Sequence, residues 1–436
     1  MNNPFQICIF TDKAATNLTP YQLTRPCYTI PNGYYNLIEK IQLISPDTPL
    51  TLLCKKEHTH FLKKRHPKIS INLLNKSLPT LYINGRCNIT KPHFNELIKS
   101  ITAVKNYLFI KESNVIGAFC TDTLNEQLFT LLSQEPNFED IIALTRKNAI
   151  VEEKRYIQII SHWWDYLTHL SHNLLQDFEY SPKKSLIEGN LSTFSILTND
   201  KNMFIHRQST IHDFTALDAT NGPIYIDEDV VIHPFTKITG PCYIGKHSTI
   251  NAHTDITNTH IGAHCKIGGE IKNSIIQSYS NKAHFGFLGD SLVGEWVNLG
   301  AGTTTSNLKL SYGNIQSSDN ASKETMDTKK QFLGTLFGDY VKTGIQSAFE
   351  CGTIISSACS LYGTAVHPKF VPPFTWGQVN EYQHQNITAF VETLERTMAR
   401  RNITLTDEEK MQFKTLQDAL THQHTVKAAS FTNTTS

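Results

Sequence analysis

Residues 270–310 bring together side chains that could carry out acid–base chemistry: a glutamate, lysines, a histidine and several asparagines. The imidazole of His284 has an ordinary pKa near neutrality, so it can accept a proton from an amine, which attacks an acyl group only when neutral. Gly300-Ala301-Gly302 has little side-chain bulk, so an extended ligand could lie close to its backbone. The segment favours acyl transfer with His284 as general base. The alternative is that His284 only occupies a corner of the fold.

A six-residue repeat precedes and enters this segment and predicts the fold that positions it. A period of six fits neither an α-helix nor a single alternating strand. It fits a solenoid with three flat sides, in which the aliphatic residue of each side points inward. Ordinary strands with isoleucines six apart by chance are the alternative. The repeating isoleucines are Ile205 and Ile211, then Ile226, Ile232, Ile238, Ile244, Ile250 and Ile256, and after one five-residue step Ile261 and Ile267.

The repeat weakens over residues 270–322 and partly returns over residues 341–363. Between these parts, the polar residues 317–330 predict a loop that leaves a corner of the solenoid, where functional loops are often placed. Glycine, asparagine and aspartate are expected at the corners, because they tolerate a left-handed backbone. Gly289 and Gly300 are therefore expected to be corner residues.

The first 195 residues have a different pattern, in which short apolar runs alternate with helical stretches. This alternation is typical of an α/β domain with a parallel sheet. Residues 151–180 predict an amphipathic helix. Its Trp163 and Trp164 are expected to be packing anchors between domains rather than a platform for a ligand.

The C-terminal residues predict two helices. Thr-Asp-Glu-Glu at 406–409 is a capping sequence, and Met-Ala-Arg-Arg at 398–401 places basic charge at a helix end, which is favourable there and is preferred to phosphate binding. Residues 430–436 are expected to fray. The predicted domains are an α/β domain (1–195), a solenoid (196–377) and a helical appendage (378–436).

Composition and charge exclude several classes of protein. Lys and Arg number 40 against 39 Asp and Glu, so the net charge of +1 gives no field for nucleic acid or an anionic membrane. No apolar run is long enough to span a bilayer, and the first residues do not resemble a signal peptide. The nine cysteines form no C-x-x-C pair. We expect a cytoplasmic protein with reduced thiols and no metal site.

A specific order of motifs stands out in the first segment: His284, Leu-Gly-Asp at 288–290, Val-Asn-Leu-Gly-Ala-Gly at 297–302 and Asn307. This order resembles the acetyltransferase half of the bifunctional enzymes that acetylate glucosamine 1-phosphate and uridylylate the product. It resembles even more the archaeal sugar-1-phosphate nucleotidylyltransferases with an attached acetyltransferase. The resemblance implies a left-handed parallel β-helix, acetyl-CoA as co-substrate, an amino-sugar phosphate as acceptor and a homotrimer.

The same resemblance implies roles for individual residues. His284 would be the general base, Lys272 would hold the sugar phosphate, and Lys309 is a weaker candidate for phosphate. The other implied assignments are Glu270, Asn298 and Phe287 at the substrate, and Ala301 and Asn307 at the cofactor.

Two positions depart from the family pattern. Thr257 falls where the family has an arginine that grips the phosphate, and a threonine cannot make a bidentate charged contact. Phe287 replaces a tyrosine and lacks its hydroxyl group. These departures leave the acceptor sugar open.

The N-terminal half has landmarks of its own. Residues 17–26, NLTPYQLTRP, are similar to the opening of the GlmU-like putative sugar nucleotidyltransferases, which implies a nucleotidyltransferase-like, Rossmann-like domain, a nucleoside triphosphate as partner and Mg²⁺ if the domain is active. Working members have a glycine-rich phosphate loop, but no glycine precedes Gly33 here. Arg25 would substitute as the phosphate contact. No metal ligand is assigned, and Asp12 is the carboxylate considered for that role.

Three functions remain open. The leading hypothesis is an acetyl-CoA-dependent N-acetyltransferase acting on an amino-sugar 1-phosphate. The second is a sugar-1-phosphate nucleotidyltransferase resembling UDP-GlcNAc pyrophosphorylase, in which the β-helix serves assembly. The third is a non-catalytic ligand-binding relative, because fold alone does not decide function.

Overall fold

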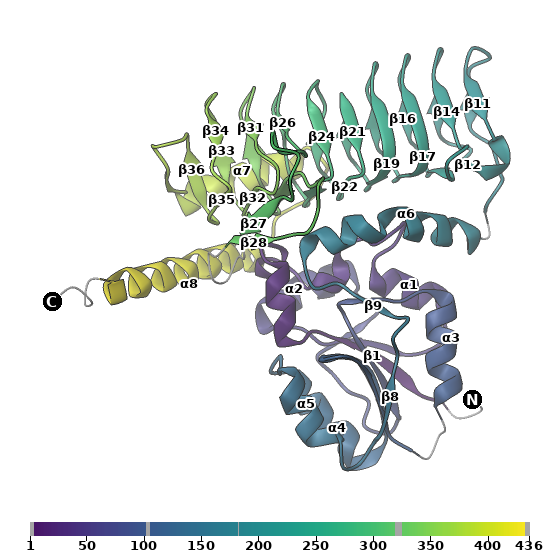
Figure 1. Ribbon diagram of the computed structural model, residues 1–436, viewed down its shortest axis with the longest axis vertical. Helices are drawn as coiled ribbons and strands as arrows, with labels where there is room; N and C mark the ends of the chain where they lie inside the picture. Colours follow the sequence, from purple (N-terminus) through teal and green to yellow (C-terminus); the bar gives the residue numbers. More distant parts are fainter. Residues whose placement is uncertain (1–3, 102–104, 182, 319–324, 432–436) are drawn as a thin grey trace.

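The computed structural model describes residues 4–101, 105–181, 183–318 and 325–431, with side chains described up to residue 420. Figure 1 shows an α/β domain below a long β-helix, with helix α6 (Trp163–Glu179) between them and helix α8 (Asp407–Phe431) projecting away from both. The predicted order of α/β domain, left-handed β-helix and C-terminal helices is confirmed.

A seven-stranded sheet forms the core of the N-terminal domain, in the order β3-β2-β1-β4-β7-β6-β8. Strands β1 to β4 are parallel, but β7 runs antiparallel to both β4 and β6. The prediction of a parallel sheet is therefore wrong at this edge, because a tight turn with Glu112 at φ 52° joins β6 and β7 as a hairpin. The strands are β1 (Gln6–Phe10), β2 (Leu50–Leu52), β3 (Ser70–Ile71), β4 (Thr80–Asn84), β6 (Tyr107–Lys111), β7 (Asn114–Cys120) and β8 (Ile150–Glu153).

Helices cover both faces of this sheet. Ile7 and Ile9 of β1 pack in one cluster with α1, α2 and α3, whereas Cys8 and Phe10 pack in the other with α4 and α5, as the alternation of a strand requires. The remaining elements are α1 (Leu37–Ile44), α2 (Thr59–Arg65), β5 (Cys87–Asn88), α3 (Lys91–Ser100), α4 (Asp122–Leu132), α5 (Phe138–Thr145) and β9 (Gln158–Ile159).

The β-helix stacks short parallel strands on three faces. The first face holds β11 (Ile196–Thr198), β14 (Ala216–Asp218), the first halves of β17 (Lys237–Ile244) and β19 (Asp255–Ile261), β21 (Glu270–Lys272), β24 (Phe287–Gly289), β26 (Thr304–Thr305), β31 (Ala348–Phe349) and β34 (Val366–His367). The second holds β12 (Met203–Ile205), β15 (Ile224–Ile226), the second halves of β17 and β19, β22 (Ile275–Ile276), β25 (Leu292–Val293), β29 (Leu336–Phe337), β32 (Ile354–Ile355) and β35 (Phe370–Val371). The third holds β10 (Asn190–Leu191), β13 (Thr210–Ile211), β16 (Val231–Ile232), β18 (Thr249–Ile250), β20 (Lys266–Ile267), β23 (Asn281–Lys282), β30 (Lys342–Thr343), β33 (Ser360–Leu361) and β36 (Thr375–Gly377).

The repeating isoleucines fill one continuous core inside these coils, and each is at most 1% exposed. The column continues through the segment in which the repeat weakens, since Ile271 pairs with Ile256 below it and Leu288 above it. The repeat is hard to read there because Lys282 and Thr305 take inward positions, in register with Ile267 and Phe349. The six-residue period therefore predicts the core, and its interruptions mark polar residues inside it.

Aromatic residues turn many corners of the β-helix in a left-handed conformation. Their rings stack from coil to coil along one corner: His247 on His264 at 4.7 Å, His264 on Tyr279 at 4.9 Å and Tyr279 on Trp296 at 4.4 Å. The expectation that Gly289 turns a corner is wrong, because it lies within β24.

The predicted polar loop leaves the β-helix after β26 and returns at β29. It contains the antiparallel pair β27 (Gln316–Ser318) and β28 (Thr325–Asp327), while residues 319–324 lie outside the described residues. A further short strand, β37 (Gln383–His384), pairs antiparallel with β36.

The C-terminal helices pack against the aromatic corner. Phe390 of α7 (Ile387–Ala399) contacts Phe374, and Phe413 of α8 contacts Tyr340. The capping start at Thr406 is confirmed, since its hydroxyl accepts from the Glu409 amide and the Glu409 carboxylate accepts from the Thr406 amide. Residues 432–436 of the predicted tail lie outside the described residues.

Helix α6 joins the two large domains. Trp163 and Trp164 are buried in one cluster with Ile275, Leu292 and Leu336 of the β-helix, which confirms them as packing anchors. All nine cysteines are buried and unpaired, the thiol state expected from the sequence. In the described part of the chain, every helix is too short or too polar to cross a bilayer.

Candidate functional site

The first face of the β-helix presents Glu270 and Lys272 together. They flank the inward Ile271 on β21, so both side chains leave the same side of the strand and both are exposed. The Cα partner of Lys272 in the coil below is Thr257, which is where the sequence expects an arginine to be replaced. In the described part of the chain, neither Glu270 nor Lys272 forms an ion pair.

Phe287 lies directly above Glu270 in the next coil, and its ring folds across Gly289. A Cβ atom built on Gly289 would lie 2.3 Å from Cζ of Phe287. The glycine of the Leu-Gly-Asp motif therefore makes room for an aromatic ring on the face that carries Glu270 and Lys272.

His284 stands at the corner between β23 on the third face and β24 on the first, and its side chain is exposed. The corner of the next coil sits directly on it, because the Gly302 amide donates to the Phe285 carbonyl at 3.1 Å. Gly302 has φ +73°, and a Cβ there would lie 3.2 Å from the Phe285 ring. Ala301 is thus brought beside the His284 corner, and the roles of base and cofactor contact remain predictions.

Asn298 is exposed on the third face, one coil above Asn281, whose amide donates to its oxygen at 3.3 Å. Arg401 of the basic helix end reaches the same Asn281, with 3.3 Å between Nη2 and Oδ1. Asn298 therefore lies on a polar strip next to the His284 corner.

Asn307 and Lys309 lie away from that corner. Asn307 donates at 2.6 Å to Asp290, which follows β24 whereas His284 precedes it, so the two lie at opposite edges of the first face. Asp290 also accepts from Asn273 at 2.5 Å, and Asn258 continues this ladder with a 2.8 Å bond to Asn273. Lys309 is near Asp327 of the loop hairpin, whose pKa is lowered mainly by a hydrogen bond from the Lys329 amide and least by the charge of Lys309.

Arg25 requires a correction. It is 1% exposed and ties the N-terminal domain to the β-helix: Nε and Nη2 donate to Asp339 at 2.9 and 2.7 Å, Nη1 donates to Glu295 at 3.0 Å, and Nη2 also donates to Gln277. Burial opposes its charge, but Asp339 and Glu295 outweigh this and raise the pKa of Arg25. Because all three guanidinium nitrogens already donate within the protein, Arg25 is not available to a nucleotide phosphate.

Asp12 is also engaged. Arg86 donates to both of its carboxylate oxygens, at 2.8 Å from Nε and 2.7 Å from Nη2, and Asn84 donates to Oδ2 at 2.8 Å. These residues follow β1 and end β4, the edge of a sheet at which α/β domains usually bind ligands. Because the Asp12 carboxylate is buried and paired with Arg86, it stabilises the fold and is not free to bind a ligand.

The N-terminal domain is similar to one protein family. Residues 7–185 match the model of a family described as sugar nucleotidyl transferase.

Two of the curated proteins similar to this chain are two-part enzymes. The chain is 34% identical over 153 residues to a bifunctional sugar-1-phosphate nucleotidylyltransferase/acetyltransferase of Sulfurisphaera tokodaii, covering 33% of this chain and 36% of that one. It is 29% identical over 210 residues to the bifunctional protein GlmU of Synechococcus elongatus, covering 38% and 42%. The chain thus spans about two fifths of the length of these relatives.

One solved structure similar to this chain is a UDP-N-acetylglucosamine acyltransferase of Francisella novicida. The identity is 14%, the coverage is 50% of this chain and 76% of that one, and the TM-score is 0.29. A likeness this weak supports no argument, and the strand register defines the β-helix here.

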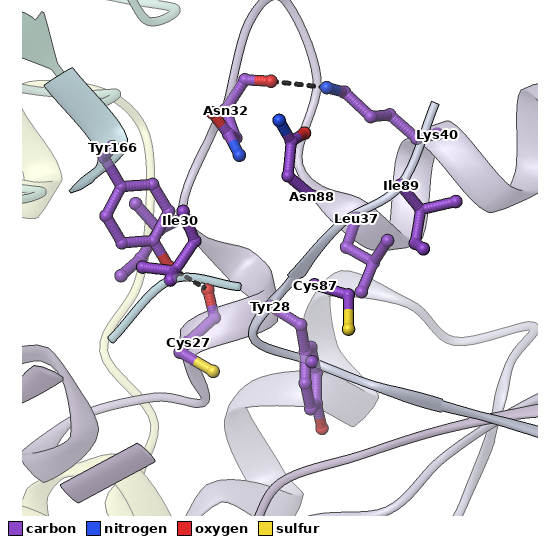
Figure 2. A pocket seen from close by; sticks show the side chains of 12 residues that line it. Cys27, Tyr28, Ile30, Asn32, Leu37, Lys40, Cys87, Asn88, Ile89 and Tyr166 are labelled. Carbon is purple, nitrogen blue, oxygen red and sulfur yellow. Dashed lines mark hydrogen bonds between the residues drawn. The ribbon is translucent and has the colours of Figure 1, made fainter. Parts of the chain in front are cut away.

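The N-terminal domain has little free space at the ends of its central strands. A cavity lined by Cys27, Tyr28 and Gly85 lies there, and its volume of about 10 Å³ holds no more than a water molecule. Figure 2 shows its side chains closing around it, with Lys40 donating to the Asn32 carbonyl.

The residues of this domain do not fit the magnesium ion that an active nucleotidyltransferase would need. Asp12 is neutralised by Arg86, and no cluster of three or more His, Cys, Asp or Glu residues suited to a metal occurs among the described residues. A larger hollow of about 320 Å³, lined by the buried pair of Lys40 and Asp177, opens between α1, α3 and the end of α6.

Two residues at the site were missed by the sequence analysis. Lys282 lies inside the β-helix and donates to the carbonyl of His284 at 2.9 Å. Asp290 accepts from asparagines on both neighbouring coils. The signal for Lys282 was the break in the aliphatic repeat, whereas Asp290 belonged to a motif whose internal bonding only the stacked coils reveal.

Proposed function

We propose that the chain is an acetyl-CoA-dependent N-acetyltransferase that acts on an amino-sugar 1-phosphate. The observation that carries this proposal is the His284 corner, where His284 is exposed, the Gly302 amide of the next coil donates to the adjacent Phe285 carbonyl, and the following strand lies on the face of Glu270 and Lys272. A base, a site of close backbone approach and a cation for phosphate are thus within one pair of coils.

The chemistry assigned to this corner is a single acyl transfer. His284 accepts a proton from the amino group, whose nitrogen forms a bond to the thioester carbon. The carbon–sulfur bond breaks, and the thiol leaves with a proton, so that an amide and free coenzyme A result. Lys272 binds the phosphate as a point charge, and Glu270 accepts a hydrogen bond from the sugar.

The acceptor is expected to differ from the one that the family resemblance implies. Thr257 below Lys272 supplies no second charge, and Phe287 offers a ring face without a hydroxyl. An apolar ring beside a single cation favours a sugar with fewer hydroxyl groups near its amine, such as a deoxyamino sugar 1-phosphate.

We further propose that the active form is a homotrimer. Phe194, Phe214 and Phe235 stack along the corner that leads to His284, with centroids 5.7 and 5.2 Å apart, and each is more than half exposed. A neighbouring copy would cover this ladder and complete the site.

Nucleotidyl transfer is not proposed, because Arg25 and Asp12 are both engaged in buried ion pairs. Ligand binding in the N-terminal domain remains a separate candidate, which the 320 Å³ hollow beside Lys40 favours.

The test measures thiol release from acetyl-CoA with a panel of amino-sugar 1-phosphates, on protein shown by sedimentation to be a trimer. His284→Asn should reduce turnover about 10²–10⁴-fold, because the proton acceptor is lost. His253→Asn is the matched control, since His253 is an exposed histidine on the same corner two coils earlier. Equal turnover of wild type and His284→Asn would remove His284 from the mechanism, and silence across the whole panel would contradict the acetyltransferase.

A further inference from the structure

Lys282 occupies a position that the β-helix reserves for aliphatic side chains. Its Cα partner in the coil below is Ile267, and Ile250 and Ile232 continue the same inward column. Lys282 is 3% exposed. A charged group therefore takes a core position next to the proposed site.

The ammonium group of Lys282 has two acceptors, both backbone carbonyls at the His284 corner. Nζ donates to the Gly268 carbonyl at 2.8 Å and to the His284 carbonyl at 2.9 Å. In the corner below, the absence of a side chain at Gly269 leaves space for the ammonium group. A Cβ on Gly269, whose φ is +86°, would lie 2.9 Å from Nζ. The lysine and the glycine corner therefore fit one another.

The peptide unit on the other side of His284 is held as well. The Asn251 amide passes over one coil and donates to the Ala283 carbonyl at 2.7 Å. The carbonyls before and after the His284 Cα atom are thus each fixed by a side chain from inside or below the corner. This leaves the backbone under the imidazole little freedom to shift.

This arrangement is unfavourable for stability. Burial lowers the pKa of Lys282 to about 8, which means that the folded chain disfavours its charge. In the described part of the chain no acidic group pairs with it. An isoleucine would fill the column without this cost, and residues that break a packing rule in this way tend to be found at functional sites.

We propose that Lys282 is a positioning residue for His284. It holds the backbone of the corner, and thereby keeps the imidazole that accepts the proton in one orientation toward the amine. The proposal deepens the acetyltransferase function and rests on it for its kinetic part. Its structural part, the fixing of residues 283–287, stands independently of any activity.

The test compares Lys282→Met with wild type, because methionine fills the column without donating to the carbonyls. Ile250→Met is the matched control, two coils earlier in the same column. Hydrogen exchange of the amides at 283–287 should become faster in Lys282→Met, and kcat should fall about 10- to 100-fold, as expected for a displaced catalytic group. The KM for acetyl-CoA should stay within about twofold, and Ile250→Met should change none of these values.

Exchange at 283–287 that is the same in wild type and Lys282→Met would overturn the proposal. A KM for acetyl-CoA that rises by the same factor by which kcat falls would also overturn it, because that pattern indicates general loss of structure. If wild type itself is silent with every acceptor, the acetyltransferase fails, and the exchange data still decide whether Lys282 fixes the corner.

Discussion

The two regions with the strongest polar motifs differ in whether their charged side chains are buried and paired or exposed. At the ends of the N-terminal strands, Arg25, Asp12 and Arg86 are buried, and their charged atoms are bonded to other parts of the chain. At the β-helix corner, His284 and Lys272 are exposed. A motif whose donors are saturated holds the fold together, whereas one whose donors are free can bind a ligand.

The saturated region of the N-terminal domain also serves as an interface. The segment that follows β1 is bonded to the β-helix: the Tyr21 hydroxyl donates to the Phe337 carbonyl at 2.8 Å, and the Pro20 carbonyl accepts from Ser357 at 3.3 Å. The stretch that would otherwise approach phosphates is the docking surface for the second domain.

The substitution Arg25→Met has the largest expected effect. It tests whether the buried charges of the N-terminal region stabilise the fold. It leaves Asp339 and Glu295 buried with fewer partners, so the free energy of unfolding should fall by about 3–5 kcal/mol. Denaturant unfolding measures this loss.

The control for Arg25 is Arg396→Met, which removes an exposed pair with Glu392 and should change stability by no more than about 0.5 kcal/mol. A stable Arg25→Met protein that has lost pyrophosphate release from a nucleoside triphosphate would reverse our assignment. Arg25 would then be a phosphate contact, and the N-terminal domain would be catalytic.

The solenoid could be predicted because each face contributes one inward aliphatic residue, so the sequence repeats every six residues. Lys282 was hidden because the spacing shortens to five residues at Ile261, four at Ile271 and five at Ile276, so counting in sixes loses the next inward position. Aromatic corners such as Tyr279 and Trp296 were not foreseen, since stacking between coils offsets a strained backbone that single-residue preferences disfavour.

The domain interface could not be predicted from the sequence. Arg25 and Asp339 are 314 positions apart, and neither carries a local signal of its partner. The placement of Asn307 could not be predicted either. The motif order groups it with His284, but in the stacked coils it lies at the opposite edge of the face. Motif order predicts the region of a site, whereas the register of the coils decides which side chains meet.

A second prediction concerns the buried interface at acid pH. His260 is fully buried, and its ring nitrogen lies 2.7 Å from the Gly33 carbonyl of the N-terminal domain. Burial lowers the pKa of His260 to about 4, below the roughly 6.5 of an unfolded histidine. Between these values the unfolded state binds more protons, so stability is lost as the pH falls from about 6.5 to about 4, by up to about 3 kcal/mol.

His260→Gln should flatten this part of the stability profile, measured as the change in unfolding free energy between pH 7 and pH 4.5. His253→Gln is the control, because that histidine is exposed and its removal should leave the slope unchanged. Identical slopes in wild type and His260→Gln would show that the saturated interface does not respond to acid through this residue.

The smallest effect tests the open region, through Lys272→Met. If Lys272 binds the acceptor phosphate, its loss should raise the KM for the sugar about 10-fold and leave kcat nearly unchanged, since the contact is made before and during the reaction alike. Lys237→Met is the matched control on the same face, because Lys237 already lies 3.7 Å from Asp255. Equal increases for both variants would indicate diffuse attraction by the face, and no increase for Lys272→Met would place the phosphate elsewhere. A selective increase would show that a free cation on this face binds ligand while a paired one does not, which is the distinction drawn between the two regions.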